Sequence, residues 1–207
     1  MLRINNAESA EFEQDLAMLA ATGVCTVMLP KTESPAQIAH VRGAGSLDVL
    51  ALIESARGVD QVDAIPAADG VTRLVFGTLD LAIDLNLDID HALDGLSYAA
   101  GRLTIASRLA GLAAPVAGVT PQLGDHDRLL SDLTWSRRHG LDAKLCIHPN
   151  QIEPVHDALT PDAQALDWAR RVLAADQASP GAAQLDGHMI DRPVVLAARP
   201  AMARADH

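Results

Sequence analysis

The sequence predicts an α/β protein in which helices cover a parallel sheet. Short β-rich runs alternate with Ala- and Leu-rich segments, and the first four runs start about two dozen residues apart, the length of one strand–turn–helix–turn unit. Hydrophobic residues make up 49% of the chain but aromatic residues only 2%, so the core must consist of Ala, Val, Leu and Ile, which suits parallel strands under helices. A length of 207 residues fits one domain, or one domain with an extension.

Six strands are expected from the apolar runs. They begin near Leu2, Thr26, Val49, Leu74, Ala117 and Ala143. Six are too few for an eight-stranded barrel. The pattern alone therefore leaves two arrangements open, an open doubly wound sheet and a barrel without its first two units.

Four helical segments are expected between these strands. They are Glu8–Ala21, a segment that begins at Ser34-Pro35, His91–Leu112 and Asp125–His139. Gly23 and Gly140 end the first and the last of them, as glycine commonly does after a helix. The third segment is expected to break at or near Gly101.

Beyond the sixth strand the repeating pattern stops. We expect residues 1–152 to form the barrel portion and residues 153–207 a C-terminal helical extension. Within the extension, Thr160 should cap a helix that runs from Ala163 to about Asp176, residues 178–187 should form a loop, and a final helix should start at Asp191. The extension either packs on a neighbouring subunit or caps its own chain, and the pattern does not decide between the two.

Composition limits the possible partners. A net charge of −11 argues against nucleic acid, because phosphate binding needs a basic surface. We see no signal peptide and no membrane span, so a cytoplasmic protein with no membrane partner is expected. Cys25 and Cys146 stand in apolar runs and are expected to be buried, reduced thiols.

Two acidic residues mark the candidate site. Glu54 and Asp80 each follow an apolar strand-like run, and the carboxyl ends of parallel strands meet at one rim, where such folds place their chemistry. Two carboxylates with no His or Cys beside them form a hard oxygen site, which suits Mg²⁺. The alternative is that Glu54 only pairs with a nearby arginine.

Three further residues lie near the same rim. Arg3 should point away from the side of its strand that carries its apolar neighbours, where it either binds a carboxylate or oxyanion or faces solvent on an edge strand. His148 reads as a structural group and Lys31 as a rim cation or ion-pair partner.

Several segments occur together in an order that identifies a family. They are Leu2-Arg3-Ile4-Asn5, Val27-Met28-Leu29-Pro30-Lys31, Ile53-Glu54-Ser55-Ala56-Arg57-Gly58, Phe76-Gly77-Thr78-Leu79-Asp80-Leu81, Cys146-Ile147-His148-Pro149-Asn150-Gln151, Trp168-Ala169-Arg170-Arg171 and Gly187-His188-Met189-Ile190-Asp191-Arg192-Pro193. In this order they resemble the citrate lyase β-subunit-like branch of the HpcH/HpaI aldolase superfamily. The resemblance covers nearly the whole chain.

The resemblance implies a TIM-type (β/α) barrel, here incomplete with about six strands. It implies a Mg²⁺-dependent carbon–carbon lyase that cleaves or forms a 3-hydroxyacyl thioester, such as malyl-, citramalyl- or citryl-CoA, from an acyl thioester and a 2-oxo acid. Its metal ligands fall on Glu54 and Asp80, its substrate-binding arginine on Arg3, and its acid on Asp191, which would act in the site of a neighbouring subunit of a homotrimer. From its position alone, Asp191 could instead cap the last helix.

The chain departs from the family at its start. The family carries two earlier strands, with a glycine-rich and an acidic motif, that have no counterpart here. A late start codon, a fragment and a true short form completed by another chain would each produce this, and we do not expect a well-behaved monomer because the sheet edges would be unpaired. Two other functions therefore remain open: a catalytically disabled barrel that acts as an assembly or binding subunit, and a class II pyruvate-type aldolase that uses no thioester.

Overall fold

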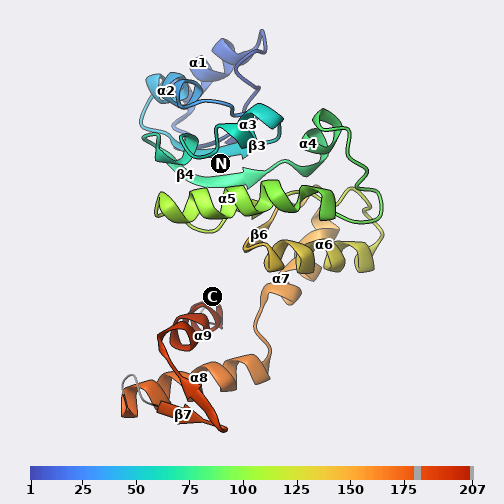
Figure 1. The fold of residues 1–207 in the computed structure, drawn as a ribbon. Coiled ribbons are helices and arrows are strands. Elements are labelled where there is room, and N and C mark those ends of the chain that lie inside the picture. The colour runs from blue at the N-terminus through green and yellow to red at the C-terminus, as the bar shows by residue number, and fades with distance from the viewer. Residues whose placement is uncertain (180–182, 206–207) are drawn as a thin grey trace. The chain divides into compact units, whose positions relative to one another are not determined.

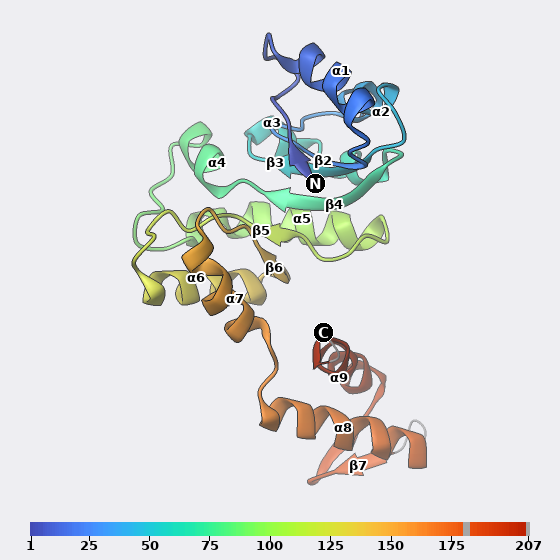
Figure 2. The same cartoon turned by 180° about the vertical axis from the view of Figure 1, so that it is seen from behind.

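The structure is a computed structural model that describes residues 1–179 and 183–205 (Figures 1 and 2). The chain forms two compact units, Met1–Val155 and His156–His207. Each unit has its own apolar core, and each is described by itself below.

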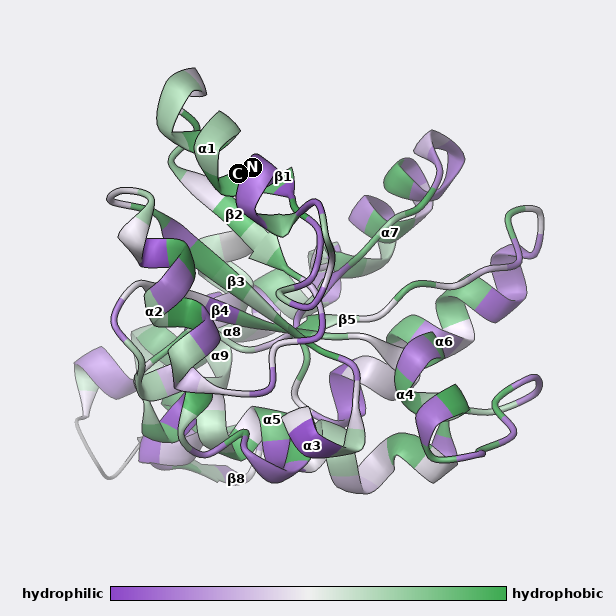
Figure 3. Cartoon of the chain, turned by 90° about the horizontal axis from the view of Figure 1, so that it is seen from above, coloured by the Kyte–Doolittle hydropathy of each residue, from purple (hydrophilic) through white to green (hydrophobic). Residues whose placement is uncertain are grey.

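The first unit contains one parallel sheet of six strands. They are β1 (Leu2–Arg3), β2 (Thr26–Leu29), β3 (Asp48–Ile53), β4 (Val71–Phe76), β5 (Val116–Ala117) and β6 (Ala143–Lys144). Their order in the sheet is the same as their order in the chain (Figure 3). A doubly wound sheet would reverse direction at a switch point, so the structure confirms the alternative of an incomplete TIM-type barrel.

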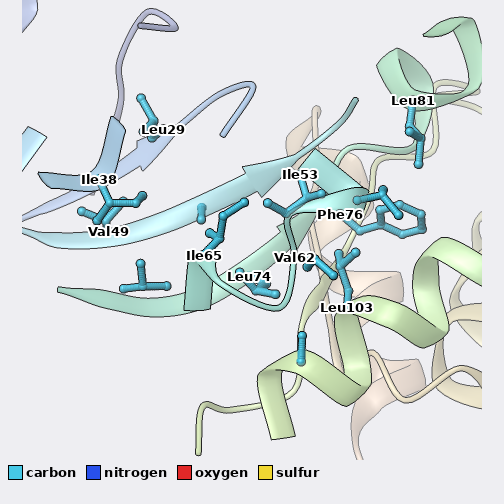
Figure 4. Packing of buried hydrophobic residues seen from close by; sticks show 14 of the residues in the cluster. Leu29, Ile38, Val49, Ile53, Val62, Ile65, Leu74, Phe76, Leu81 and Leu103 are labelled. Carbon is cyan, nitrogen blue, oxygen red and sulfur yellow. The ribbon is translucent and has the colours of Figure 1, made fainter. Parts of the chain in front are cut away.

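The two faces of this sheet carry different side chains. Val27 and Ile53 belong to a large cluster that also contains core residues of the helices. Figure 4 shows the same cluster around Phe76 of β4 and Leu103 further along the chain. The opposite face holds a smaller cluster of Met28, Leu52, Val75 and Val116. The alternation follows the period of two along a strand, and it gives the sheet an outer face under helices and an inner face.

Six helices among the described residues connect the strands of the first unit, and a seventh follows the last strand and crosses the boundary between the units. They are α1 (Phe12–Thr22), α2 (Pro35–Gly43), α3 (Ala56–Asp60), α4 (Thr78–Asp84), α5 (Ser97–Leu109), α6 (His126–Arg138) and α7 (Ile152–Leu159), with short 3₁₀ turns at Ile65–Ala67, Asp94–Leu96 and Pro149–Gln151. The Ser34 side chain and Gln37 form a capping box at the start of α2. Gly23 ends α1 with a left-handed φ of 68°, as the sequence predicts.

Three predictions about this unit were wrong. α5 begins at Ser97 rather than His91 and runs through Gly101 without a break. A single helical glycine costs only about 1 kcal/mol, and the buried residues Ala100 and Leu103 on either side of it hold the helix in place. α1 starts at Phe12, four residues later than expected. Cys25 is exposed and Cys146 is half-buried, although both are free thiols as predicted.

The second unit contains two helices and a hairpin. They are α8 (Ala163–Ala178), β7 (Ala183–Leu185), β8 (His188–Ile190) and α9 (Arg192–Ala205), and the two strands pair antiparallel. The loop predicted over residues 178–187 was wrong where it meets the end of α8 and β7, and β8 follows it; residues 180–182 of that loop lie outside the described residues. Asp162, not Thr160, caps α8 through a bond from the Ala165 N–H.

Within the described ranges, none of the helices has the length and apolar character of a membrane span.

Candidate functional site

A pocket of about 380 Å³ opens at the carboxyl ends of the first strands. Arg3 at the end of β1, Lys31 after β2, Glu54 after β3 and Asp80 in the first turn of α4 all contribute to its lining. Helix α1 contributes Asp15. The predicted metal ligands and the predicted arginine therefore line one pocket, together with Lys31.

Glu54 directly follows β3 and is only 4% exposed. Its Oε1 accepts a hydrogen bond of 3.0 Å from the Lys31 main-chain N–H. Burial raises the pKa of the Glu54 carboxyl above its ordinary value, against the opposing effect of the Lys31 N–H, and the negative charge of Asp80 raises it further. The charges of Arg3 and Lys31 act in the opposite direction. These interactions place Arg3, Lys31 and Asp80 within electrostatic reach of the buried Glu54 carboxylate.

An unusual backbone conformation aims the Lys31 N–H at Glu54. Lys31 has a φ of 47°, in the left-handed region that costs a residue with a side chain roughly 1–2 kcal/mol. Thr32, which is fully buried, holds the turn: its hydroxyl donates to the Leu29 carbonyl at 2.8 Å and its N–H to the Leu52 carbonyl at 3.0 Å. The turn after β2 is thus fixed to β3, and its strain orients a donor toward the acid.

Gly77 provides the space that the Glu54 side chain occupies. A Cβ atom on Gly77 would lie 2.3 Å from the Cβ and 2.7 Å from the Oε2 of Glu54. Gly77 is also the residue before α4, whose first turn carries the exposed Asp80. The missing side chain therefore allows the segment between β4 and α4 to pass beside Glu54.

Arg3 lies on the inner face of β1, as predicted. Leu2 and Ile4 on either side of it contribute to the outer cluster, so the intervening side chain points the other way. Arg3 is exposed, and within the described part of the chain its guanidinium makes no hydrogen bond or ion pair. The same holds for the Lys31 ammonium group in the described ranges. Both cations are available to an anionic ligand.

The chemistry of this donor set suits a hard cation that keeps most of its other ligands. Among the described residues no group of three or more His, Cys, Asp and Glu side chains is placed to hold a metal ion, so a cation in this pocket would have few protein ligands, such as the predicted pair Glu54 and Asp80. Mg²⁺ is commonly held by one or two protein carboxylates, with water and substrate oxygens in its remaining positions. A cation here would also offset the negative charge that raises the pKa of Glu54.

Asp191 belongs to the second unit, where it lies between β8 and α9. Its Oδ1 accepts a 3.2 Å hydrogen bond from the Val194 N–H, so it caps α9. This is the structural role that its position allowed. Its catalytic role remains a prediction.

A second group of polar residues, at the ends of β5 and β6, was not predicted. Arg128 donates to Asp132 Oδ1 at 2.7 Å, and the other oxygen of Asp132 accepts from the Thr120 hydroxyl at 2.8 Å. Gln151 donates to the Thr120 carbonyl at 2.8 Å. The spacing of four between Arg128 and Asp132 on one helix was the available signal.

His148 has the structural bond expected of it, since its Nδ1 accepts from the Asn150 N–H at 3.2 Å.

Comparison with known proteins gives consistent results. The family model described as HpcH/HpaI aldolase/citrate lyase matches residues 1–149. A citrate lyase subunit beta-like protein of Mycobacterium tuberculosis is 36% identical over 211 residues, which cover 99% of this chain and 76% of that protein.

Two solved structures are similar throughout the matched region. The CitE protein of M. tuberculosis in complex with magnesium, acetoacetate and coenzyme A matches with a TM-score of 0.88 and 33% identity, over 100% of this chain and 78% of that one. The citrate lyase beta subunit of M. tuberculosis complexed with oxaloacetate and magnesium matches with a TM-score of 0.69 and 32% identity, over 77% of this chain and 73% of that one.

Proposed function

The chain belongs to the HpcH/HpaI aldolase/citrate lyase family, and from this premise we propose that it is a Mg²⁺-dependent carbon–carbon lyase. Its substrate would be a 3-hydroxyacyl thioester, such as malyl-, citramalyl- or citryl-CoA. The products would be an acyl thioester and a 2-oxo acid. The similar CitE structure, which holds magnesium, acetoacetate and coenzyme A, supports this class of ligands.

One observation carries the proposal: Glu54 and Asp80, from neighbouring β/α units, line the same pocket as two cations without hydrogen-bonding or ion-pair partners among the described residues. Glu54 and Asp80 would hold the metal. When bound, Mg²⁺ supplies a Lewis acid beside the oxygen that gains negative charge as the C–C bond breaks. Arg3 would bind the carboxylate of the 2-oxo acid portion, or that oxygen, by charge-assisted hydrogen bonds.

The reaction needs two proton movements. The 3-hydroxyl group loses its proton and its carbon becomes the carbonyl carbon of the 2-oxo acid, while the bonding electron pair moves to the thioester as an enolate. The enolate carbon then takes up a proton. We propose that Asp191 of a neighbouring protomer in a homotrimer delivers this proton, or removes it when the bond is formed.

Asp80→Asn is the first test, because it removes a charge at nearly constant volume. We expect Mg²⁺-dependent cleavage of the three CoA thioesters to fall by at least about a thousandfold. Asp60→Asn, which removes an exposed carboxylate from the neighbouring helix α3, should change turnover less than about twofold. Unchanged turnover in Asp80→Asn would rule out the metal role, and equal turnover of the free hydroxy acids would favour the aldolase without a thioester.

Asp191→Asn tests the second acid, since Asn caps a helix about as well as Asp but cannot transfer the proton. The variant should fold normally and be inactive. Co-expression with Asp80→Asn should restore part of the activity, because a mixed trimer contains sites with one intact copy of each residue. Full activity of Asp191→Asn alone would contradict its catalytic role.

A further inference from the structure

The wall of the pocket that carries Arg3 has little support from the sheet. β1 contains only two residues and pairs only with β2 among the described strands. Its last main-chain bond runs from the Ile4 N–H to the Met28 carbonyl at 3.2 Å. The next residue, Asn5, lines the pocket beyond the end of the ladder. Another group must therefore fix this segment.

Asp15 of α1 holds Asn5 at two points. Its Oδ2 accepts from the Asn5 main-chain N–H at 2.7 Å and from the Asn5 Nδ2 at 2.9 Å. Hydrogen bonds to an ionised carboxylate are roughly twice as strong as neutral ones. The helix that presents Asp15 is firmly packed, since Phe12 and Leu16 are only 2% and 6% exposed. The contact thus attaches the pocket wall to a rigid element.

This contact also sets the orientation of the Asn5 amide. Because Nδ2 is used by Asp15, Oδ1 points away from the carboxylate, and it accepts no hydrogen bond from any residue the structure describes. Asn5 lines the same pocket as Arg3, so one segment of the chain contributes an amide acceptor and a guanidinium to the lining.

We propose that Asp15 is a positioning residue of the lyase site. By binding Asn5 twice it fixes the segment after β1 and so holds the adjoining strand end, with Arg3, in the orientation that binds the 2-oxo acid. Asp15 then acts through Asn5 rather than on the ligand itself, because its Oδ2 receives both donors of that residue. The ligand part of this inference rests on the proposed function, whereas the attachment of Asn5 does not.

Asp15→Ala removes both bonds and places the best helix former in α1, so the helix should remain intact. Glu13→Ala is the matched control: it removes an exposed acid, paired with His40, from the same helix turn. In the ligand-free protein we expect the Asn5 amide hydrogen to exchange at least about tenfold faster in Asp15→Ala than in the control, because an amide without its acceptor is less protected. Asp15→Asn, which keeps one neutral acceptor, should fall between them.

Pyruvate in the presence of Mg²⁺, measured by titration calorimetry, is the second readout. The Kd for pyruvate should rise about tenfold in Asp15→Ala, the loss typical for a group that orients a ligand-binding residue, while the Kd for Mg²⁺ alone should not change. In an Arg3→Met background the effect on pyruvate should disappear, since Asp15 acts through that wall.

Asn5 exchange and pyruvate affinity equal to those of Glu13→Ala would overturn the inference. A weakened Mg²⁺ affinity of similar size would also overturn it, because a general loss of structure would then explain the data. If the wild-type protein bound none of glyoxylate, pyruvate and oxaloacetate, the 2-oxo acids that the three thioesters would yield, the proposed function would fail, and Asn5 exchange alone would decide whether Asp15 holds this segment.

Discussion

Two groups of charged residues at the carboxyl ends of the same sheet differ in whether their side chains have partners within the protein. In the first, which we call the pocket rim (Arg3, Lys31, Glu54 and Asp80), both cations lack hydrogen-bonding and ion-pair partners among the described residues. The second, which we call the buried network, consists of Thr120, Arg128, Asp132 and Gln151. There the Arg128 guanidinium donates to Asp132 and to the Ile89 and Asp90 carbonyls, and both Asp132 oxygens are hydrogen-bonded.

The difference separates charges that stabilise the fold from charges that we propose bind ligands. A buried polar group is stable when its partners are in the protein, and an unpaired group costs free energy unless solvent or a ligand satisfies it. Thr120, Asp132 and Gln151 are each at most 4% exposed and fully engaged, so they connect the loops after β4, β5 and β6. The pocket rim instead leaves the Arg3 and Lys31 side chains without protein partners among the described residues, as the binding of an anion would require.

The largest contrast should appear in stability. Asp132→Ala leaves the Arg128 side chain, only 13% exposed, without its carboxylate. Breaking a buried pair in this way costs about 3–5 kcal/mol in the free energy of unfolding. Arg3→Ala should change it by less than about 0.5 kcal/mol, because it removes an exposed side chain without hydrogen-bonding or ion-pair partners among the described residues. Urea denaturation measures both, and equal losses would remove the distinction between the two regions.

Gly77→Ala tests how closely the pocket rim is packed. The added methyl group would meet Glu54 at 2.3 Å, so the carboxylate must move. We expect Mg²⁺ affinity to fall about 10- to 100-fold, the range found when a group that orients a metal ligand is lost.

Gly101→Ala in α5 is the control for the glycine substitution. A Cβ atom there meets nothing within 4 Å, and the variant should be more stable by about 0.5–1 kcal/mol with unchanged Mg²⁺ affinity. If both glycine variants bound Mg²⁺ like the wild-type protein, Gly77 would have no part in positioning Glu54.

The fold was predictable because its signals are local. Strand runs and helix starts, such as those predicted at Ser34-Pro35 and Asp125, depend on a few adjacent residues, and the structure confirms them. The start of α5 was not predictable in this way. Leu93 and Leu96 belong to the Ala- and Leu-rich run that predicts a helix, but in the structure they lie in an irregular segment and a 3₁₀ turn. Burial of both side chains against the outer cluster overrides their helix propensity.

The residues of the site likewise fall into those that the sequence predicts and those that it does not. Glu54, Asp80 and Arg3 could be found because strand ends and side-chain alternation place them, and they do line one pocket. The parts that orient them depend on contacts between distant segments. The Lys31 N–H reaches Glu54 across 23 positions of the chain and Asp15 reaches Asn5 across ten. Neither spacing has a sequence signature, and a lysine at positive φ is not expected from its residue type.

Lys144 shares features of both regions, because it is a cation like those of the pocket rim and is hydrogen-bonded like the members of the buried network. Its substitution should have a smaller effect than the substitution of Asp132 or Gly77. Its ammonium group donates to the Gly118 carbonyl, and burial lowers its pKa from 10.5 to about 8, with the charge of nearby Asp132 opposing the shift. The unfolded chain keeps this proton up to about pH 10.5, while the folded chain releases it near pH 8. Between these values the folded state binds fewer protons, so stability rises with pH.

Lys144→Met removes this dependence and leaves other titrating groups in place. The stability of the wild-type protein relative to the variant should therefore increase by about 1 kcal/mol between pH 7 and pH 9, a change that denaturation curves at four or five pH values can resolve. If the free energies of unfolding of the wild-type protein and the variant changed equally with pH, the lysine would be as well solvated in the folded state as in the unfolded chain. It would then belong with the exposed cations of the pocket rim rather than beside the buried network.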